Sequence, residues 1–135
     1  MRFDRYLRHG ELTDALRALA DAHPDLVRLQ SIGGSFEGRE ILLAVVTRFE
    51  TGADRDKPAL WVDWNIHATE VAGSMACLYF LKYLVDGYGR DPDATRVLRI
   101  AGGGGLFWLL AQGFAIGRPL ESIEQVSEAP KVGQA

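Results

Sequence analysis

The first amphipathic pattern in the chain spans residues 12–22. Apolar side chains recur there at helical spacing, at Leu12, Leu16, Leu19 and Ala20. Charged residues occupy other positions of the same segment, and Thr13 is a suitable N-cap. The pattern predicts an amphipathic helix that ends before Pro24.

Two strands joined as a hairpin are predicted next. Residues 27–32 form a short alternating run with β-branched side chains, which is typical of a strand. Residues 40–47, E-I-L-L-A-V-V-T, form a continuous apolar run, which is typical of a strand covered on both faces. The glycines of G-G-S-F-E-G mark the turn between these two strands.

A third strand and a long helix follow a polar loop. Residues 59–66, A-L-W-V-D-W-N-I, are dense in apolar side chains and predict a buried strand. Residues 69–85 have apolar side chains at helical spacing, and Lys82 is the only charge after the first turn. We therefore expect a helix that is buried on nearly all sides.

A shorter helix is predicted up to Arg99, with Asp91 and Pro92 at its start. The order of these elements predicts an α/β fold in which helices sandwich a mixed β-sheet. The carboxyl end of the third strand leads directly into the long helix. Ligands of open α/β sheets bind at such strand ends.

The pattern changes after Arg99. The chain has 15 basic and 18 acidic residues, of which only five lie in the last 36 positions. Residues 100–117 carry no charge, which meets the lower length limit of a membrane span, but six of them are glycine. We therefore expect no membrane span, and we separate residues 1–99 from a Gly-rich, loosely ordered tail over residues 100–135.

Composition narrows the class of protein. The 135 residues are 47% hydrophobic and 24% charged, which is the profile of at most one globular domain. The net charge of −3 leaves no broad basic field, so we expect no nucleic-acid partner. Cys77, the one cysteine, is interpreted as a small buried hydrophobe. The charged amino terminus lacks the apolar stretch of a signal peptide, from which we expect a cytoplasmic protein.

The candidate chemistry lies in N-I-H-A-T-E, residues 65–70, between the third strand and the long helix. His67 and Glu70 are three residues apart, and a strand-to-helix turn lets their imidazole nitrogen and carboxylate oxygen converge on one ion. Zinc accepts both ligand types. The spacing arises often by chance, so a plain structural role, with Glu70 near the positive end of the helix, stays open at this point.

Three blocks of the sequence together resemble the M14 family of zinc carboxypeptidases, in order and in approximate spacing. They are A-H-P-D-L-V-R-L, S-I-G-G-S-F-E-G-R-E-I-L-L-A-V and K-P-A-L-W-V-D-W-N-I-H-A-T-E-V-A-G-S. The resemblance covers residues 3–99 and implies that His67 and Glu70 are zinc ligands. It also implies a carboxypeptidase that hydrolyses C-terminal peptide bonds, in which zinc lowers the pKa of a water and polarises the scissile carbonyl.

The family pattern also shows what this sequence lacks. Catalytic zinc sites usually have three protein ligands, and the family's downstream histidine, catalytic glutamate, late tyrosine and Asn-Arg pair have no matching segment. His9 and His23 precede the motif and are interpreted as surface or helix-end residues, while Arg118 and Glu121 lie in no recognisable motif. We therefore expect part of a carboxypeptidase domain, apparently truncated, that is weakly active or inactive alone and whose catalytic residues stay unassigned.

Some residues around the motif have smaller expected roles. Thr69 stands where many pancreatic-type members have arginine, so substrate preference does not carry over. Asp63 is a candidate acceptor that orients His67, with a carboxylate held by backbone groups as the alternative. Arg39 is expected to pair with a local carboxylate and fix the hairpin. Aromatic side chains of the third strand and long helix are assigned to the core: Trp61, Trp64, Tyr79, Phe80 and Tyr83.

Two other functions stay open. A zinc deacylase of the aspartoacylase and succinylglutamate desuccinylase type shares H-x-x-E and would act on acylated amino acids. Such enzymes look more like H-G-x-E, so Ala68 favours the peptidase. A non-catalytic α/β module would instead bind a partner through the apolar edge left by missing strands. Neither the oligomeric state nor the origin of the tail, native or the product of a truncation or frameshift, follows from the sequence.

Overall fold

The computed structural model describes residues 1–58, 60–65, 67, 69–100 and 106–109. The helices are α1 (His9–Ala22), α2 (Val71–Gly87) and α3 (Pro92–Ile100), and the strands are β1 (Val27–Gly34), β2 (Glu40–Val46), β3 (Trp61–Trp64) and β4 (Leu106–Leu109). Two short 3₁₀ turns, Phe49–Thr51 and Asp54–Asp56, lie between β2 and β3. The predicted order of helices and strands is therefore confirmed up to α3.

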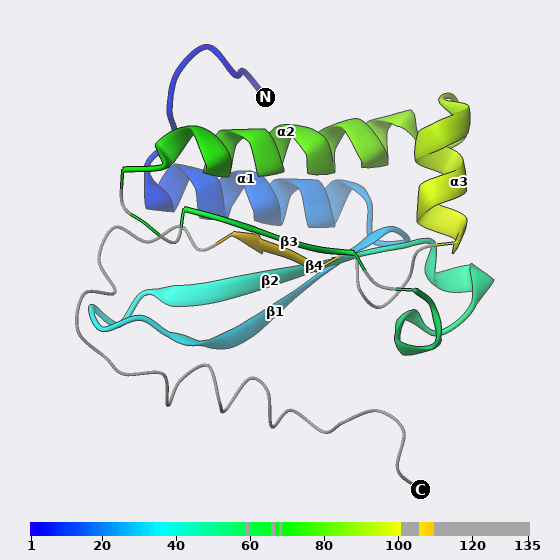
Figure 1. Cartoon of the computed structure of the whole chain (residues 1–135), viewed down its shortest axis with the longest axis horizontal. Coiled ribbons are helices and arrows are strands. Elements are labelled where there is room, and N and C mark those ends of the chain that lie inside the picture. Colours follow the sequence, from blue (N-terminus) through cyan, green and yellow to red (C-terminus); the bar gives the residue numbers. More distant parts are fainter. Residues whose placement is uncertain (59, 66, 68, 101–105, 110–135) are drawn as a thin grey trace, which may run out of the picture.

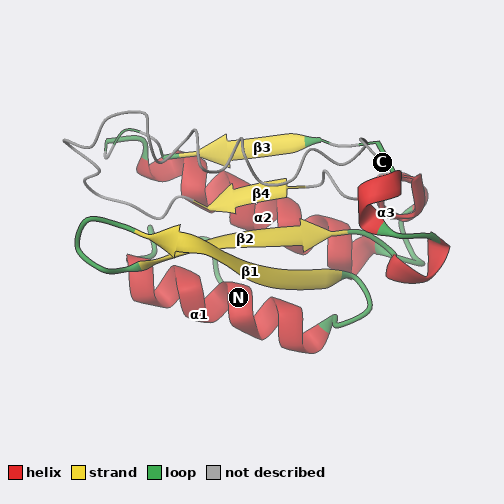
Figure 2. Ribbon diagram, turned by 90° about the horizontal axis from the view of Figure 1, so that it is seen from below, coloured by secondary structure: helices red, strands yellow, loops and turns green. Residues whose placement is uncertain are grey.

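The strands form one mixed sheet in the order β1-β2-β4-β3 (Figure 2). β1 and β2 are antiparallel, β2 and β4 are antiparallel, and β3 and β4 are parallel. The predictions of a mixed α/β fold and of a β1–β2 hairpin are confirmed. β4 belongs to the segment that we separated as a tail, so four residues of that segment complete the sheet between β2 and β3.

The β1–β2 hairpin has a tight turn. Ser35 N–H donates to the carbonyl of Arg39 at 2.7 Å, and Arg39 N–H donates to Ser35 Oγ at 3.0 Å. Gly38, with a φ of 73°, has the left-handed conformation that glycine adopts at low cost. The Arg39 guanidinium lies 2.7 Å from the Glu37 carboxylate, which confirms the expected local ion pair.

The main core lies between the sheet and the helices α1 and α2, which cover the same face (Figure 1). Buried leucines of α1 and α2 pack against Leu42, Ala44 and Val46 of β2. The alternate residues Leu43 and Val45 point to the opposite face and are buried too, so β2 is covered on both faces as predicted. Each fully buried leucine stabilises the fold by about 1.5–3 kcal/mol.

Two helix predictions need correction. α1 begins at His9, three residues before the predicted start, and Thr13 lies inside it instead of capping it. The Glu11 carboxylate accepts the Arg8 N–H at 2.9 Å and pairs with Arg5. These contacts begin the helix earlier than the apolar spacing indicated.

α2 also differs from its prediction, because it is buried on one face only. It begins at Val71, and its outer face exposes Tyr79 by 59% and Tyr83 by 41%. Phe3 packs edge-on against the Tyr79 ring, with 5.2 Å between centroids. The assignment of these two tyrosines to the core is therefore wrong, whereas Cys77 is buried as expected. The side chains of Trp61 and Trp64 lie outside the described part of the chain.

α3 is held at both ends. Asp91 Oδ1 accepts the Ala94 N–H at 2.8 Å, which confirms the predicted start of this helix. At its other end, Leu98 and Arg99 carbonyls accept hydrogen bonds from the Thr47 and Thr51 hydroxyls at 3.2 and 3.1 Å. The connection from β2 is thereby fastened to the end of α3.

No helix in the described ranges is both long and apolar enough to cross a membrane. The uncharged run 100–117 lies largely outside these ranges. Its described residues are Ile100, at the end of α3, and the strand β4.

Candidate metal site

The turn from β3 to α2 carries the candidate ligands (Figure 1). β3 ends at Trp64 and α2 begins at Val71, so the turn lies at the carboxyl end of a strand within the sheet. Asn65 follows the strand with a φ of 64°. Asparagine tolerates this left-handed conformation better than most residues, and it turns the chain sharply out of the strand direction.

His67 and Glu70 converge within this turn. His67 Nδ1 lies 3.1 Å from Glu70 Oε1, and the Glu70 N–H donates to the His67 carbonyl at 3.0 Å. The side chains are 76% and 49% exposed. The contact with His67 holds the pKa of the Glu70 carboxyl below its ordinary value, which favours the anionic form of this carboxyl. An imidazole and an anionic carboxylate therefore face solvent side by side.

This pair fits two positions of a zinc site. Ligand atoms at about 2.0–2.1 Å from a tetrahedral zinc ion lie about 3.3 Å apart. The observed separation of 3.1 Å is close to that value. Within the described residues, no group of three His, Cys, Asp or Glu side chains could hold a metal ion. The structure thus brings together the two candidate ligands that the resemblance implied, with no third one among the residues that it describes.

The other predicted residues do not join the pair. His9 is the first residue of α1 and His23 follows its last turn, which confirms their interpretation as helix-end residues. The His23 ring faces Asp86 at 3.5 Å. Thr69 is exposed. The side chains of Asp63, Arg118 and Glu121 lie outside the described residues, and their predicted roles are not tested.

Asn65 is a residue of this turn that the sequence analysis did not single out. Asn65 is 7% exposed, and among the described residues no donor reaches its buried Oδ1. The available signal was its place directly after a strand and two residues before His67. An asparagine at such a point favours a left-handed turn.

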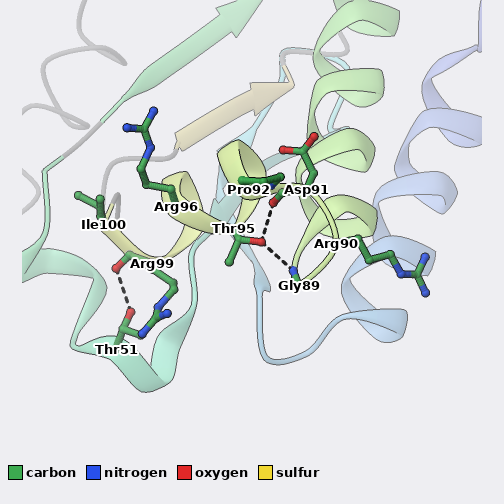
Figure 3. A pocket seen from close by; sticks show the side chains of 9 residues that line it. All are labelled: Thr51, Gly89, Arg90, Asp91, Pro92, Thr95, Arg96, Arg99 and Ile100. Carbon is green, nitrogen blue, oxygen red and sulfur yellow. Dashed lines mark hydrogen bonds between the residues drawn. The ribbon is translucent and has the colours of Figure 1, made fainter.

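A separate hollow of about 680 Å³ lies at the other end of α2, beside α3 (Figure 3). α2 has 17 residues and is therefore about 25 Å long, which separates this hollow from the ligand pair. Arg90, Arg96 and Arg99 line it but point in different directions. The Thr95 hydroxyl makes hydrogen bonds within the protein, since it accepts the Gly89 N–H and donates to the Asp91 carbonyl. The hollow is thus distinct from the candidate metal site.

Comparisons with known proteins point to one family. The zinc carboxypeptidase family (peptidase M14) matches residues 12–101. Carboxypeptidase A1 of Sus scrofa is 38% identical over 88 residues, which are 65% of this chain and 20% of that protein. Carboxypeptidase B2 of Mus musculus is 31% identical over 97 residues, which are 72% of this chain and 22% of that protein. The chain therefore spans about a fifth of the length of these curated relatives.

Solved structures show the same relationship. The crystal structure of thrombin activatable fibrinolysis inhibitor aligns with 78% of this chain and 25% of its own, with a TM-score of 0.68 and 26% identity. Carboxypeptidase A from Helicoverpa armigera aligns with 80% of this chain and 25% of its own, with a TM-score of 0.67 and 23% identity, a likeness of fold. Residues 12–101, which match the family, include the turn that carries His67 and Glu70. This chain belongs to the M14 zinc carboxypeptidase family.

Proposed function

We propose that this chain carries part of the catalytic domain of a zinc-dependent carboxypeptidase, which hydrolyses the C-terminal peptide bond of peptides. In this proposal His67 and Glu70 are two of the zinc ligands. The observation that carries it is the convergence of His67 Nδ1 and Glu70 Oε1 at 3.1 Å on an exposed turn at a strand end. Membership of the family supports the reaction class.

The two side chains have the chemistry that zinc ligation requires. The imidazole of His67 offers a nitrogen lone pair in its neutral form, and the Glu70 carboxylate, whose contact with His67 lowers its pKa further, is anionic at neutral pH. Their exposure leaves room for further ligands and for a substrate. When bound, zinc would supply Lewis acidity toward a peptide carbonyl and toward water.

The described residues do not complete the catalytic machinery. Hydrolysis of this type needs a third protein ligand and a group that moves protons. We assign neither to this chain, so we expect it to bind zinc weakly and to show little or no peptidase activity alone. A longer protein that contains this sequence would supply the remaining groups.

Zinc binding by the purified chain tests the proposal. We expect one zinc ion per chain, with binding lost in H67A and E70Q. H23A is the matched control, because His23 lies beside Asp86 and away from the motif, and it should bind zinc like the wild type. Equal zinc binding by H67A and the wild type would contradict the assignment.

Substrate class is tested on a longer protein that contains this sequence. We expect release of the last residue from a peptide with a free C-terminus, no release from the same peptide with an amidated C-terminus, and loss of activity in H67A. Preferential cleavage of an acylated amino acid would instead indicate a deacylase. Robust peptide hydrolysis by the 135-residue chain alone would contradict the expected incompleteness.

A further inference from the structure

Asn65 combines two local irregularities at the start of the turn that carries His67. Its φ is 64°, and no other non-glycine residue in the described ranges has a positive φ. The residue is 7% exposed, yet its Oδ1 finds no donor among the described residues. Each feature lowers the stability of a fold. Such costs are typical of positions where backbone geometry serves a site.

The two ligand side chains are largely exposed to solvent. His67 is 76% exposed and Glu70 is 49% exposed, and the Glu70 carboxylate interacts with both the ring and the backbone N–H of His67. A side chain that packs against little else points where its backbone directs it. The direction of His67 therefore depends on the path of the chain between β3 and α2.

Two backbone features fix that path. The hydrogen bond from the Glu70 N–H to the His67 carbonyl, at 3.0 Å, sets the ligands relative to each other. The left-handed conformation of Asn65 sets the ligand turn relative to the end of β3. Asn65 is buried, so this first residue of the turn lies inside the protein while His67 reaches solvent.

We propose that Asn65 is a positioning residue of the metal site, whose left-handed conformation and buried side chain direct His67 toward the ion. This inference rests on the proposed function, because the ion in question is the proposed zinc. A residue that resists positive φ should redirect His67 and weaken zinc binding. Loss of a supporting residue around a metal site typically weakens metal binding about 10–100-fold.

Three variants of the chain separate conformation from general stability. N65A disfavours the left-handed conformation, whereas N65G permits it without a side chain. G38A is the matched control: Gly38 has a φ of 73°, a Cβ there meets nothing within 4 Å, and the residue lies in the β1–β2 turn. Each variant is measured by zinc titration, by thermal unfolding, and by nuclear Overhauser effects between the His67 ring and the Glu70 side chain without metal.

We expect N65A to bind zinc at least about tenfold more weakly and to lose the His67–Glu70 Overhauser effects. N65G should restore both readouts toward wild type, and G38A should lower the melting temperature alone. If N65A does not fold, N65S gives the same comparison with a small polar side chain. Wild-type zinc affinity together with intact Overhauser effects in N65A would overturn the proposal, as would equal weakening in G38A.

These readouts also separate the inference from the proposed function. A wild-type chain that binds no zinc overturns the zinc proposal, and the Overhauser effects then decide the role of Asn65 alone. Their loss in N65A but not in G38A supports positioning by Asn65. Their persistence in N65A overturns it.

Discussion

Polar groups around the two ends of α2 differ in how well they are hydrogen-bonded. At the carboxyl end, the neighbouring helix α3 has its last carbonyls bonded to Thr47, Arg48 and Thr51. Lys57 Nζ donates to the Thr47 hydroxyl, the Thr51 hydroxyl and the Arg48 carbonyl, each at 2.8 Å. At the amino end, the turn exposes two candidate ligands and leaves the buried Oδ1 of Asn65 without a donor among the described residues.

We interpret this difference as one between a region that stabilises the fold and a region that, in our proposal, holds a ligand. Where every donor has an acceptor, as at Lys57, removing a group lowers the free energy of unfolding. Where side chains are exposed, as those of His67 and Glu70 are, their removal should cost the fold little and affect binding instead. Burial lowers the pKa of the Lys57 ammonium group, so this group is partly removed from solvent. Its three hydrogen bonds therefore contribute to the stability of the fold.

The largest loss of stability should come from the core contact at the well-satisfied end. Leu98 of α3 is 1% exposed, so L98A should lower the free energy of unfolding by about 2–5 kcal/mol. Urea denaturation checks this value. V97A is the matched control, because the neighbouring Val97 is 36% exposed and should cost far less. Equal losses in the two variants would argue against the described packing of α3.

Removal of the Lys57 ammonium should have the next largest effect. K57M deletes three hydrogen bonds and a positive charge beside the carboxyl end of α3, and we expect a loss of about 1.5–3 kcal/mol in urea denaturation. K82M removes a lysine that pairs with Asp86 four residues away, and it should cost less than about 0.5 kcal/mol. If the K57M chain were as stable as the K82M chain, the stabilising role assigned to Lys57 would be contradicted.

The start of α1 should give a smaller, pH-dependent effect. Bonds from Arg5 and Arg8 hold the pKa of Glu11 at about 2, below its ordinary value of 4.5. A carboxylate with a lowered pKa stabilises the fold above its ordinary pKa, and this contribution disappears as the pH falls toward 2. We therefore expect the melting temperatures of E11Q and the wild type to differ at pH 7 and to converge toward pH 2.

The control for this pH experiment is D14N. Asp14 is exposed on the same helix, so the substitution removes one charge without the contacts that Glu11 makes. Its melting temperature should differ little from that of the wild type at pH 7. A gap between E11Q and the wild type that widens below pH 4 would contradict the assigned role of Glu11.

The smallest change in stability is expected at the ligand turn. His67 is 76% exposed, so H67A should change the free energy of unfolding by less than about 0.5 kcal/mol when no metal is present. Urea denaturation in the presence of a chelator checks this. A loss as large as that of K57M would show that His67 supports the fold, as the plain structural interpretation of the motif requires.

The sequence predicted the parts of the fold that repeat a local pattern. The apolar run 40–47 became the doubly buried β2, and Asp91 with Pro92 begins α3 as its capping chemistry indicates. The burial of α2 was overpredicted, because an apolar composition does not tell which face has a partner, and Tyr79 and Tyr83 are exposed. The pairing of β4 between β2 and β3 is a long-range contact that no local pattern contains.

The ligand pair was predictable in a different way. The spacing of His67 and Glu70 was compatible with convergence, but only the resemblance to a family distinguished a zinc site from a helix start. The role of Asn65 depends on a backbone angle and on an unpaired buried oxygen. Neither property follows from residue type alone, since asparagine is also common in ordinary turns.

X-ray absorption spectroscopy at the zinc edge of the zinc-loaded chain reports directly on the atoms that bind the ion. With His67 and Glu70 as ligands, nitrogen and oxygen neighbours at about 2.0–2.1 Å and the outer-shell scattering of one imidazole are expected. H67A should retain no bound zinc and therefore give no such spectrum, whereas the imidazole scattering should persist in H23A. A wild-type spectrum without imidazole scattering, or an unchanged spectrum in H67A, would contradict the assignment of this turn as a zinc site.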